Sequence, residues 1–169
     1  MSEQTKESIV QQQAKARPKI EDIIPQYFDG EAKQSLTEFL EYCRANKITT
    51  PWSATNRWKI KLKSEGIGMI YIGKSPCLAG GENFEKNTWY IHVNMESEYA
   101  EKENLSELIH RNILPCQRGR KNCNDTMRIL GKEIEGACPE SGRRFANPDA
   151  ETLACIKKWL EFKVKNISV

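Results

Sequence analysis

The sequence predicts an α+β fold, in which an antiparallel sheet of three or more strands is packed on one face by helices. Apolar residues recur at helical spacing near both ends of the chain, and between them the period changes to two. Short Gly-rich connections between the alternating runs favour an antiparallel meander. The chain of 169 residues, 38% apolar and 29% charged, fits a single globular domain, which we expect over residues 18–169.

The N-terminal residues 1–17 are predicted to lie outside this domain as a flexible arm or a frayed helix. They are polar and rich in glutamine, and Ile9 and Val10 are their only adjacent large apolar residues. Such a segment cannot bury enough apolar surface to offset the entropy of ordering it. Pro18 ends any helix that begins there.

Three helices are expected to cover the sheet, near residues 31–46, 104–113 and 148–164. In the first of these, apolar residues at i, i+3, i+4 and i+7 make one stripe. Its members are Leu36, Phe39, Leu40 and Cys43. Asn104 is the predicted N-cap of the second helix. Asn147 and Pro148 are the predicted N-cap and first residue of the third.

The strands are predicted from alternation of side chains. In "RWKIKLK" one face carries Trp58, Ile60 and Leu62, and the other carries Arg57, Lys59, Lys61 and Lys63. The runs "IGMIYIG" and "TWYIHVNM" are the expected next strands. In the last run, Trp89, Ile91, Val93 and Met95 form one face, and Tyr90, His92 and Asn94 form the other.

The basic face of the first strand has two interpretations. Residues 57–74 carry five basic side chains and one acidic side chain, and alternate residues of a strand lie about 7 Å apart. This spacing is close to that of phosphates along a nucleic-acid strand, so the face could bind nucleic acid. The same pattern also protects an exposed edge strand against aggregation, and a solvated or protective face is the interpretation that the sequence favours.

Four aromatic residues fall on or next to the predicted meander. We expect Trp52, Trp58, Tyr71 and Trp89 to line a pocket for a small apolar or aromatic ligand. The function predicted from the sequence is therefore that of a non-enzymatic binding domain. Core packing is the alternative interpretation of these side chains.

The segment of residues 115–148 supports a second hypothesis, in which it binds zinc or nucleic acid. It holds three of the six cysteines and seven of the 26 basic side chains. Cys116, Cys123 and Cys138, together with His110, could supply the thiolate and imidazole ligands that zinc prefers. The cysteines lack the C-x₂₋₄-C spacing of structural zinc sites, so the plainer expectation is a basic loop, a hairpin and a helix start, without a cofactor.

An enzyme is the third hypothesis. No phosphate-binding loop, dinucleotide fingerprint or nucleophile elbow occurs in the sequence. A catalytic site would have to be assembled by the fold around Cys77 or His92. The chain has no apolar run near the 18 residues or more that cross a bilayer and no secretory signal at its N-terminus, so we expect it in the cytoplasm.

The motifs "ATNRWKIKLKSEGIGMIYIG", "WYIHV", "LGKEIEGAC" and "FANPDAETLACIKKWLE" resemble a family of small bacterial proteins frequent in Clostridium-type anaerobes. More distantly, the tryptophan-bearing strand and meander are similar to the YdhG-like domains. The resemblance covers residues 16–162 and implies no assigned chemistry. Members of the family carry a denser cysteine cluster before the "GK" motif, whereas this chain has Arg118 and Arg120 there.

Overall fold

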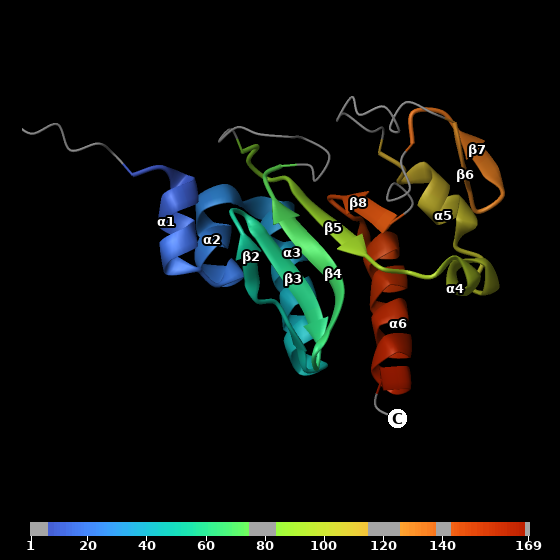
Figure 1. Ribbon diagram of the computed structural model, residues 1–169, viewed down its shortest axis with the longest axis horizontal. Helices are drawn as coiled ribbons and strands as arrows, with labels where there is room; N and C mark the ends of the chain where they lie inside the picture. Colours follow the sequence, from blue (N-terminus) through green and yellow to red (C-terminus); the bar gives the residue numbers. More distant parts are fainter. Residues whose placement is uncertain (1–6, 75–83, 115–125, 138–142, 168–169) are drawn as a thin grey trace, which may run out of the picture.

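The computed structural model describes residues 7–74, 84–114, 126–137 and 143–167. The helices are α1 (Ile9–Ala16), α2 (Ile20–Tyr27), α3 (Gly30–Ala45), α4 (Ser97–Lys102), α5 (Ser106–Arg111) and α6 (Ala150–Ile167). The strands are β1 (Ile48–Thr49), β2 (Trp52–Ala54), β3 (Arg57–Leu62), β4 (Glu65–Ile72), β5 (Trp89–Val93), β6 (Met127–Ile129), β7 (Lys132–Ile134) and β8 (Arg144–Ala146). Figure 1 shows their arrangement.

The main sheet is antiparallel and has the strand order β1-β3-β4-β5-β8, with β2 also paired to β3. The predicted meander is confirmed as β3, β4 and β5, which pair in the order in which they occur in the chain. Strand β3 lies inside the sheet, because β1 and β2 pair with one of its edges and β4 pairs with the other. The predicted α+β class is confirmed.

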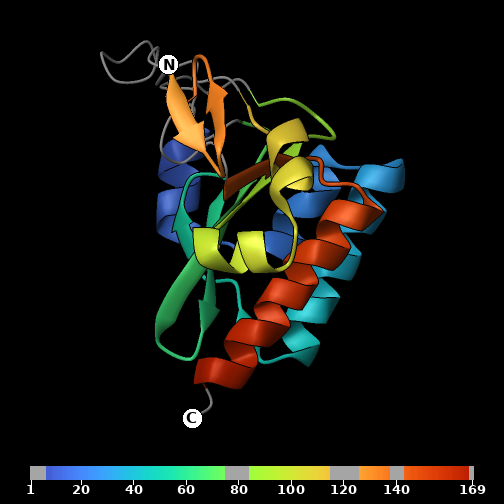
Figure 2. The same cartoon turned by 90° about the vertical axis from the view of Figure 1, so that its right-hand side faces the viewer.

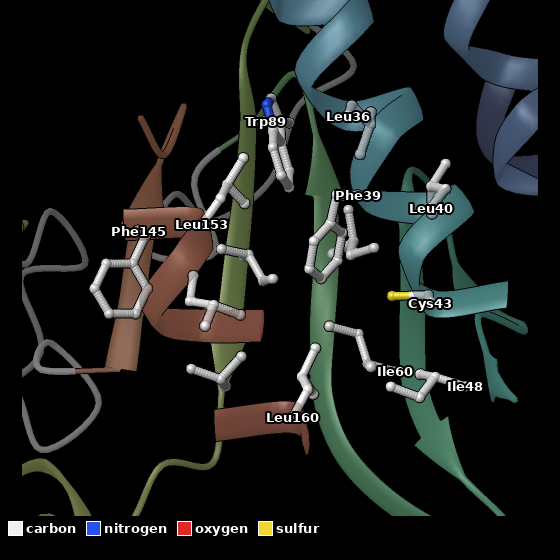
Figure 3. Close-up of a cluster of buried hydrophobic side chains, with 14 of the residues drawn as sticks. Leu36, Phe39, Leu40, Cys43, Ile48, Ile60, Trp89, Phe145, Leu153 and Leu160 are labelled. Carbon is white, nitrogen blue, oxygen red and sulfur yellow. The ribbon is translucent and has the colours of Figure 1, made fainter. Parts of the chain in front are cut away.

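Helices α3 and α6 cover one face of the sheet (Figure 2). The alternation of β3 and β5 predicts this face, since Trp58, Ile60, Trp89 and Ile91 point into it and are fully or almost fully buried. Figure 3 shows the inward stripe of α3, including Phe39, facing these strands. At about 1.5–3 kcal/mol for each large apolar side chain, burial of this layer is the main stabilising contribution to the fold.

Of the two expectations for the N-terminal arm, a helix is what the structure has in the part that it describes, as α1. The Ser8 side chain accepts a hydrogen bond from the backbone N–H of Gln11, and the Gln11 side chain accepts one from the backbone N–H of Ser8, which makes a capping box. Gln13 is buried and exchanges two hydrogen bonds with Asn56, 43 residues away. A polar contact therefore fixes the helix where the sequence lacks the apolar residues to do so.

The second and third predicted helices begin at different residues from those expected. Two short helices, α4 and α5, replace the single helix near residues 104–113, and Asn104 lies between them with a left-handed φ of 56°. Helix α6 begins at Ala150, because Asp149 rather than Asn147 accepts a hydrogen bond from the backbone N–H of Thr152, at 2.8 Å.

Asn147 instead joins three parts of the chain. Its side-chain oxygen accepts a hydrogen bond from the backbone N–H of Trp89 at 2.9 Å, and its amide donates to the Asn87 carbonyl at 3.1 Å. The Asn87 side chain exchanges hydrogen bonds with Asp29, just before α3. This polar network fixes the starts of β5, α3 and α6 relative to one another.

The predicted hairpin within residues 115–148 is confirmed as β6 and β7. These strands are joined by Leu130 and Gly131, both with positive φ, which is the backbone form that a two-residue hairpin turn requires. Among the described residues, no helix combines the length and the apolar character that crossing a membrane requires.

Candidate functional site

The face of the sheet opposite α3 and α6 carries basic and aromatic side chains, and we call it the outer face. It comprises the outward side chains of four neighbouring strands. These are Arg57, Lys59 and Lys61 of β3, Met69 and Tyr71 of β4, Tyr90 and His92 of β5, and Arg144 of β8. Apart from exposed Lys59 and buried Arg144, they are half-buried.

The strand register arranges these side chains in two rows across the sheet. In the first row Arg57 lies opposite Tyr71, which lies opposite Tyr90. In the second row Lys59, Met69, His92 and Arg144 follow one another across β3, β4, β5 and β8. Directly opposite residues in a sheet have their Cβ atoms about 4.5–5.5 Å apart, so each row is a set of neighbouring side chains.

The outer face is positively charged. Arg57, Lys59, Lys61 and Arg144 are its charged members, and none of the outward residues of the described strands in the two rows is acidic. No ion pair joins Lys59 or Lys61 to another described residue. Their ammonium groups are therefore available to an anion from solution.

Lys63, predicted on the same side as these residues, is not part of the outer face. Strand β3 ends at Leu62, and Lys63 adopts a left-handed φ of 52° in the turn that follows. Its ammonium donates to the backbone carbonyl of Ile167 near the end of α6, at 3.0 Å. A cation at this position satisfies a carbonyl that the helix end leaves without an intrahelical partner.

The interpretation of the basic residues as protection of an open edge is wrong, whereas their interpretation as a solvated face stays a prediction. Negative design against aggregation applies to strands with unpaired edges. Strand β3 is paired along both edges, so its lysines protect no open edge. A solvated face and an anion-binding surface are the two remaining explanations of these positive charges.

The outer face has a hollow of about 280 Å³ near the β3–β4 turn. Its lining combines two basic residues of β3 with residues of the turn, of β4, of β5 and of the segment that follows β5. The lining residues are Lys59, Lys61, Ser64, Gly66, Gly68, Met69, His92 and Asn94. No carboxylate is among them.

The structure does not bring the four predicted ligand-binding aromatic residues into one pocket. Trp58 is fully buried, and its indole N–H donates to the Pro18 carbonyl at 3.0 Å. Trp89 is buried against Phe39, with ring centroids 6.0 Å apart. Trp52 lies beside Trp58 on the helix-covered side, whereas Tyr71 lies on the outer face. Their predicted grouping is therefore corrected, because three support the core and one faces away from it.

A separate groove of about 680 Å³ runs between the first halves of α3 and α6, with Trp89 in its lining. This volume is in the range of small-ligand sites. Its rim is acidic rather than aromatic, since Glu31, Glu38 and Asp149 line it and Lys157 is its only basic residue. Only one of the four predicted aromatic residues lines the groove, and the expected apolar or aromatic ligand stays a prediction.

The predicted zinc ligands and the reactive cysteine are mostly beyond what the structure describes. Cys77, Cys116, Cys123 and Cys138 lie outside the described residues. Within the described ranges, no group of three or more His, Cys, Asp and Glu side chains could hold a metal ion. His110 is described, and its Nε2 lies 2.8 Å from the carbonyl oxygen of Ile129.

Sequence reasoning gave no functional role to Met69 or Tyr90, whereas it named Arg144 among the basic residues that could extend the face of β3. Tyr90 was assigned to the face opposite Trp89 by alternation, but without a functional role. Arg144 lies on β8, a strand of three residues that is too short to show a period. Only its pairing with His92 across the sheet places it in the second row.

Comparisons of the chain with models of protein families, with curated proteins and with solved structures find no match. The resemblance to the clostridial family and to the YdhG-like domains stays a prediction. Any function must be argued from the site itself.

Proposed function

We propose that the protein binds single-stranded nucleic acid on the outer face of its sheet. The observation that carries the proposal is the first row of the face, in which Arg57, Tyr71 and Tyr90 lie opposite one another on three adjacent strands. Proteins that bind single strands combine aromatic side chains, on which bases stack, with a positive surface that follows the phosphates. The outer face supplies both on rigid strands.

In this arrangement the tyrosine rings contact bases and the β3 side chains contact phosphates. Tyr71 is half-buried, and its hydroxyl donates to the sulfur of Met69 at 3.4 Å, which holds the side chain over the sheet. Stacking of one base on an aromatic ring contributes about 1–3 kcal/mol. Lys59 and Lys61 on the same strand are about 7 Å apart and can each neutralise a phosphate.

A single strand suits this face better than a duplex. The bases of a duplex are stacked on one another, so their faces are not available to Tyr71 and Tyr90. The major groove of DNA admits an α-helix or a two-stranded ribbon. A broad sheet whose recognition residues lie on four neighbouring strands does not enter it.

The proposal is tested by fluorescence anisotropy with a labelled 12-nucleotide oligo(dT) and with its RNA counterpart at low salt. We expect Tyr71→Leu, which retains bulk but removes the ring, to weaken binding about 5- to 150-fold. Lys59→Gln is expected to weaken it as well, because one phosphate contact is lost. Lys33 lies exposed on α3, on the opposite side of the sheet, so Lys33→Gln is the matched control and should bind like the wild type.

Equal affinities for the three variants and the wild type would contradict the proposal, because the binding would then not involve the outer face. Absence of binding to either oligonucleotide at low salt would contradict it directly. A duplex of the same length that binds as tightly as the single strand would argue against base stacking on the tyrosines.

A second candidate function, zinc binding near residues 115–148, is favoured by the orientation of His110. The Ile129 carbonyl can only accept a hydrogen bond, so Nε2 of His110 must carry the proton. Its Nδ1 is then the lone-pair nitrogen, and it is buried without a partner among the described residues. Zinc-binding histidines commonly donate their other ring N–H to a carbonyl in this way.

Elemental analysis of freshly purified protein tests this second candidate. With Cys116, Cys123 and Cys138 as the remaining ligands, we expect about one zinc per chain, lost on Cys123→Ser and on His110→Ala. Cys155→Ser is the matched control, because this cysteine lies half-buried on α6. Protein that contains no zinc after purification and takes up none from solution would remove the candidate.

A further inference from the structure

Two glycines of β4, Gly66 and Gly68, line the hollow on the outer face. A Cβ atom on Gly68 would stand 2.4 Å from the carbonyl oxygen of His92, so only glycine permits the close approach of these strands. A Cβ atom on Gly66 would have no heavy atom within 4 Å. Gly66 therefore leaves the hollow open without a packing reason to do so.

A β-bulge fixes the shape of the hollow. Ile60 pairs with Gly68 and Lys61 pairs with Gly66, so Ile67 is the extra residue of β4. The Ile67 carbonyl accepts a hydrogen bond from the backbone N–H of Asn94 at 3.0 Å. The Asn94 amide donates to the Gly66 carbonyl at 3.4 Å. These bonds hold the floor and one wall in place independently of any ligand.

The lining of the hollow is complementary to a compact, strongly charged anion. Two lysines, Lys59 and Lys61, and the hydroxyl-bearing Ser64 are among its lining residues. Lysine binds phosphate as a point charge, and hydrogen bonds to charged groups contribute about 1.5–3 kcal/mol each. With a volume of about 280 Å³, the hollow is at the lower limit for drug-sized ligands.

We propose that this hollow binds a terminal phosphate, the monoester group at the end of a nucleic-acid strand or on a free nucleotide. A terminal monoester carries a charge of about −1.5 to −2 at pH 7, because its second pKa is near 6. The internal diesters of a strand carry a single charge. The hollow therefore favours an end over the interior of a strand. That the bound phosphate belongs to the end of a nucleic-acid strand rests on the proposed function. That the hollow binds a phosphate monoester does not rest on it.

The experiment compares three oligo(dT) 12-mers that are identical except for a 5′-phosphate, a 3′-phosphate or hydroxyl groups at both ends. We expect one phosphorylated end to bind about tenfold more tightly than the hydroxyl form, since one extra charge-assisted hydrogen bond gives this factor. The preference should be largest above a pH of about 6, where the monoester is doubly charged. Equal affinities of the three oligonucleotides would overturn the inference.

Gly66→Val fills the hollow without removing a charge. The backbone of Gly66 does not have the positive φ that would exclude a side chain, and valine suits a strand. We expect this variant to lose the tenfold preference while its affinity for the hydroxyl form changes by less than about twofold. If Gly66→Val fails to fold, Lys61→Gln takes its place. We expect Lys61→Gln to reduce the preference for the phosphorylated end from about tenfold to about threefold, which is half of it on a logarithmic scale. A preference that survives in the folded variant would contradict the site.

A free nucleotide separates this inference from the proposed function. Thymidine monophosphate and thymidine are compared by thermal shift of the wild type and of Gly66→Val. Stabilisation by the monophosphate alone, lost in the variant, together with no binding of the hydroxyl-terminated oligonucleotide, would support the hollow and refute the single-strand proposal. Oligonucleotide binding without a preference for phosphorylated ends would leave the single-strand proposal standing and refute the hollow.

Discussion

The hydrogen-bonded pair of Gln13 and Asn56 predicts that α1 contributes to global stability. The Gln13 amide donates to the Asn56 side-chain oxygen at 2.5 Å, and its carbonyl oxygen accepts from the Asn56 backbone N–H at 2.8 Å. Gln13 is 5% exposed and Asn56 is 2% exposed. Gln13→Ala removes both partners and leaves a buried donor and a buried acceptor on Asn56.

Each buried polar group that loses its partner costs about 1–3 kcal/mol. Because α1 lies at the surface and water can replace Gln13 in part, we expect a combined loss of about 2–3 kcal/mol. In a chain of this size, this loss lowers Tm by about 4–12 °C. Gln12 is the matched control, since its side chain is exposed and bonds only to the nearby Glu7 carbonyl.

The measurement is urea unfolding of the wild type, Gln13→Ala and Gln12→Ala, followed by tryptophan fluorescence and by circular dichroism. Gln12→Ala should lie within about 0.5 kcal/mol of the wild type. Free energies of unfolding that are equal for the two variants would refute the reasoning, because α1 would then behave as the flexible arm that the sequence suggests.

Three further predictions concern the core and its edge. Trp58→Ala should destabilise the fold by about 3–5 kcal/mol in urea unfolding, whereas Lys59→Ala on the outer face should change it by less than about 0.5 kcal/mol; similar losses would contradict the assignment of the two faces. Burial raises the pKa of the Cys43 thiol to about 12, so peptide mapping after iodoacetamide treatment at pH 8 should find it unmodified in the native protein and alkylated after denaturation. For Glu96, burial alone would raise the pKa, but hydrogen bonds from Lys163 and Trp159 outweigh it and lower the pKa. Its stabilisation is therefore present above the unfolded value of about 4.3 and is lost as pH falls through the lower folded pKa. Glu96→Gln should lose less stability than the wild type on acidification from pH 7 to pH 3, and equal losses would count against this role.

The sequence predicts those parts of the fold that follow from local periodicity. The alternation in β3 and β5 assigns Trp58 and Trp89 to the core, and the stripe of α3 identifies the residues that pack on them. The position of a strand within the sheet does not follow from local periodicity. Strand β3 is an interior strand because β1 and β2 pair with its second edge, and these strands are only two and three residues long. The edge-strand interpretation of Lys59 failed for this reason.

Two other differences arise from polar contacts between distant residues. Helix α1 depends on the hydrogen bonds between Gln13 and Asn56, and the spacing of apolar residues cannot predict such a contact. Asn147 has the residue type of an N-cap, but Asp149 takes that role because the Asn147 side chain is hydrogen-bonded to Trp89. The aromatic pocket was predicted from residue type alone. Alternation along β4 would have placed Tyr71 on the other face of the sheet from Trp58 and Trp89.

The outer face as a surface for single-stranded nucleic acid is tested most directly by the salt dependence of oligo(dT) binding. Log K falls with log salt by about 0.7 for each phosphate neutralised on a single strand. If Arg57, Lys59 and Lys61 each neutralise one phosphate, we predict a slope of about −2 for the wild type and about −1.4 for Lys59→Gln. A slope near zero, or the same slope for the wild type and Lys59→Gln, would contradict the account.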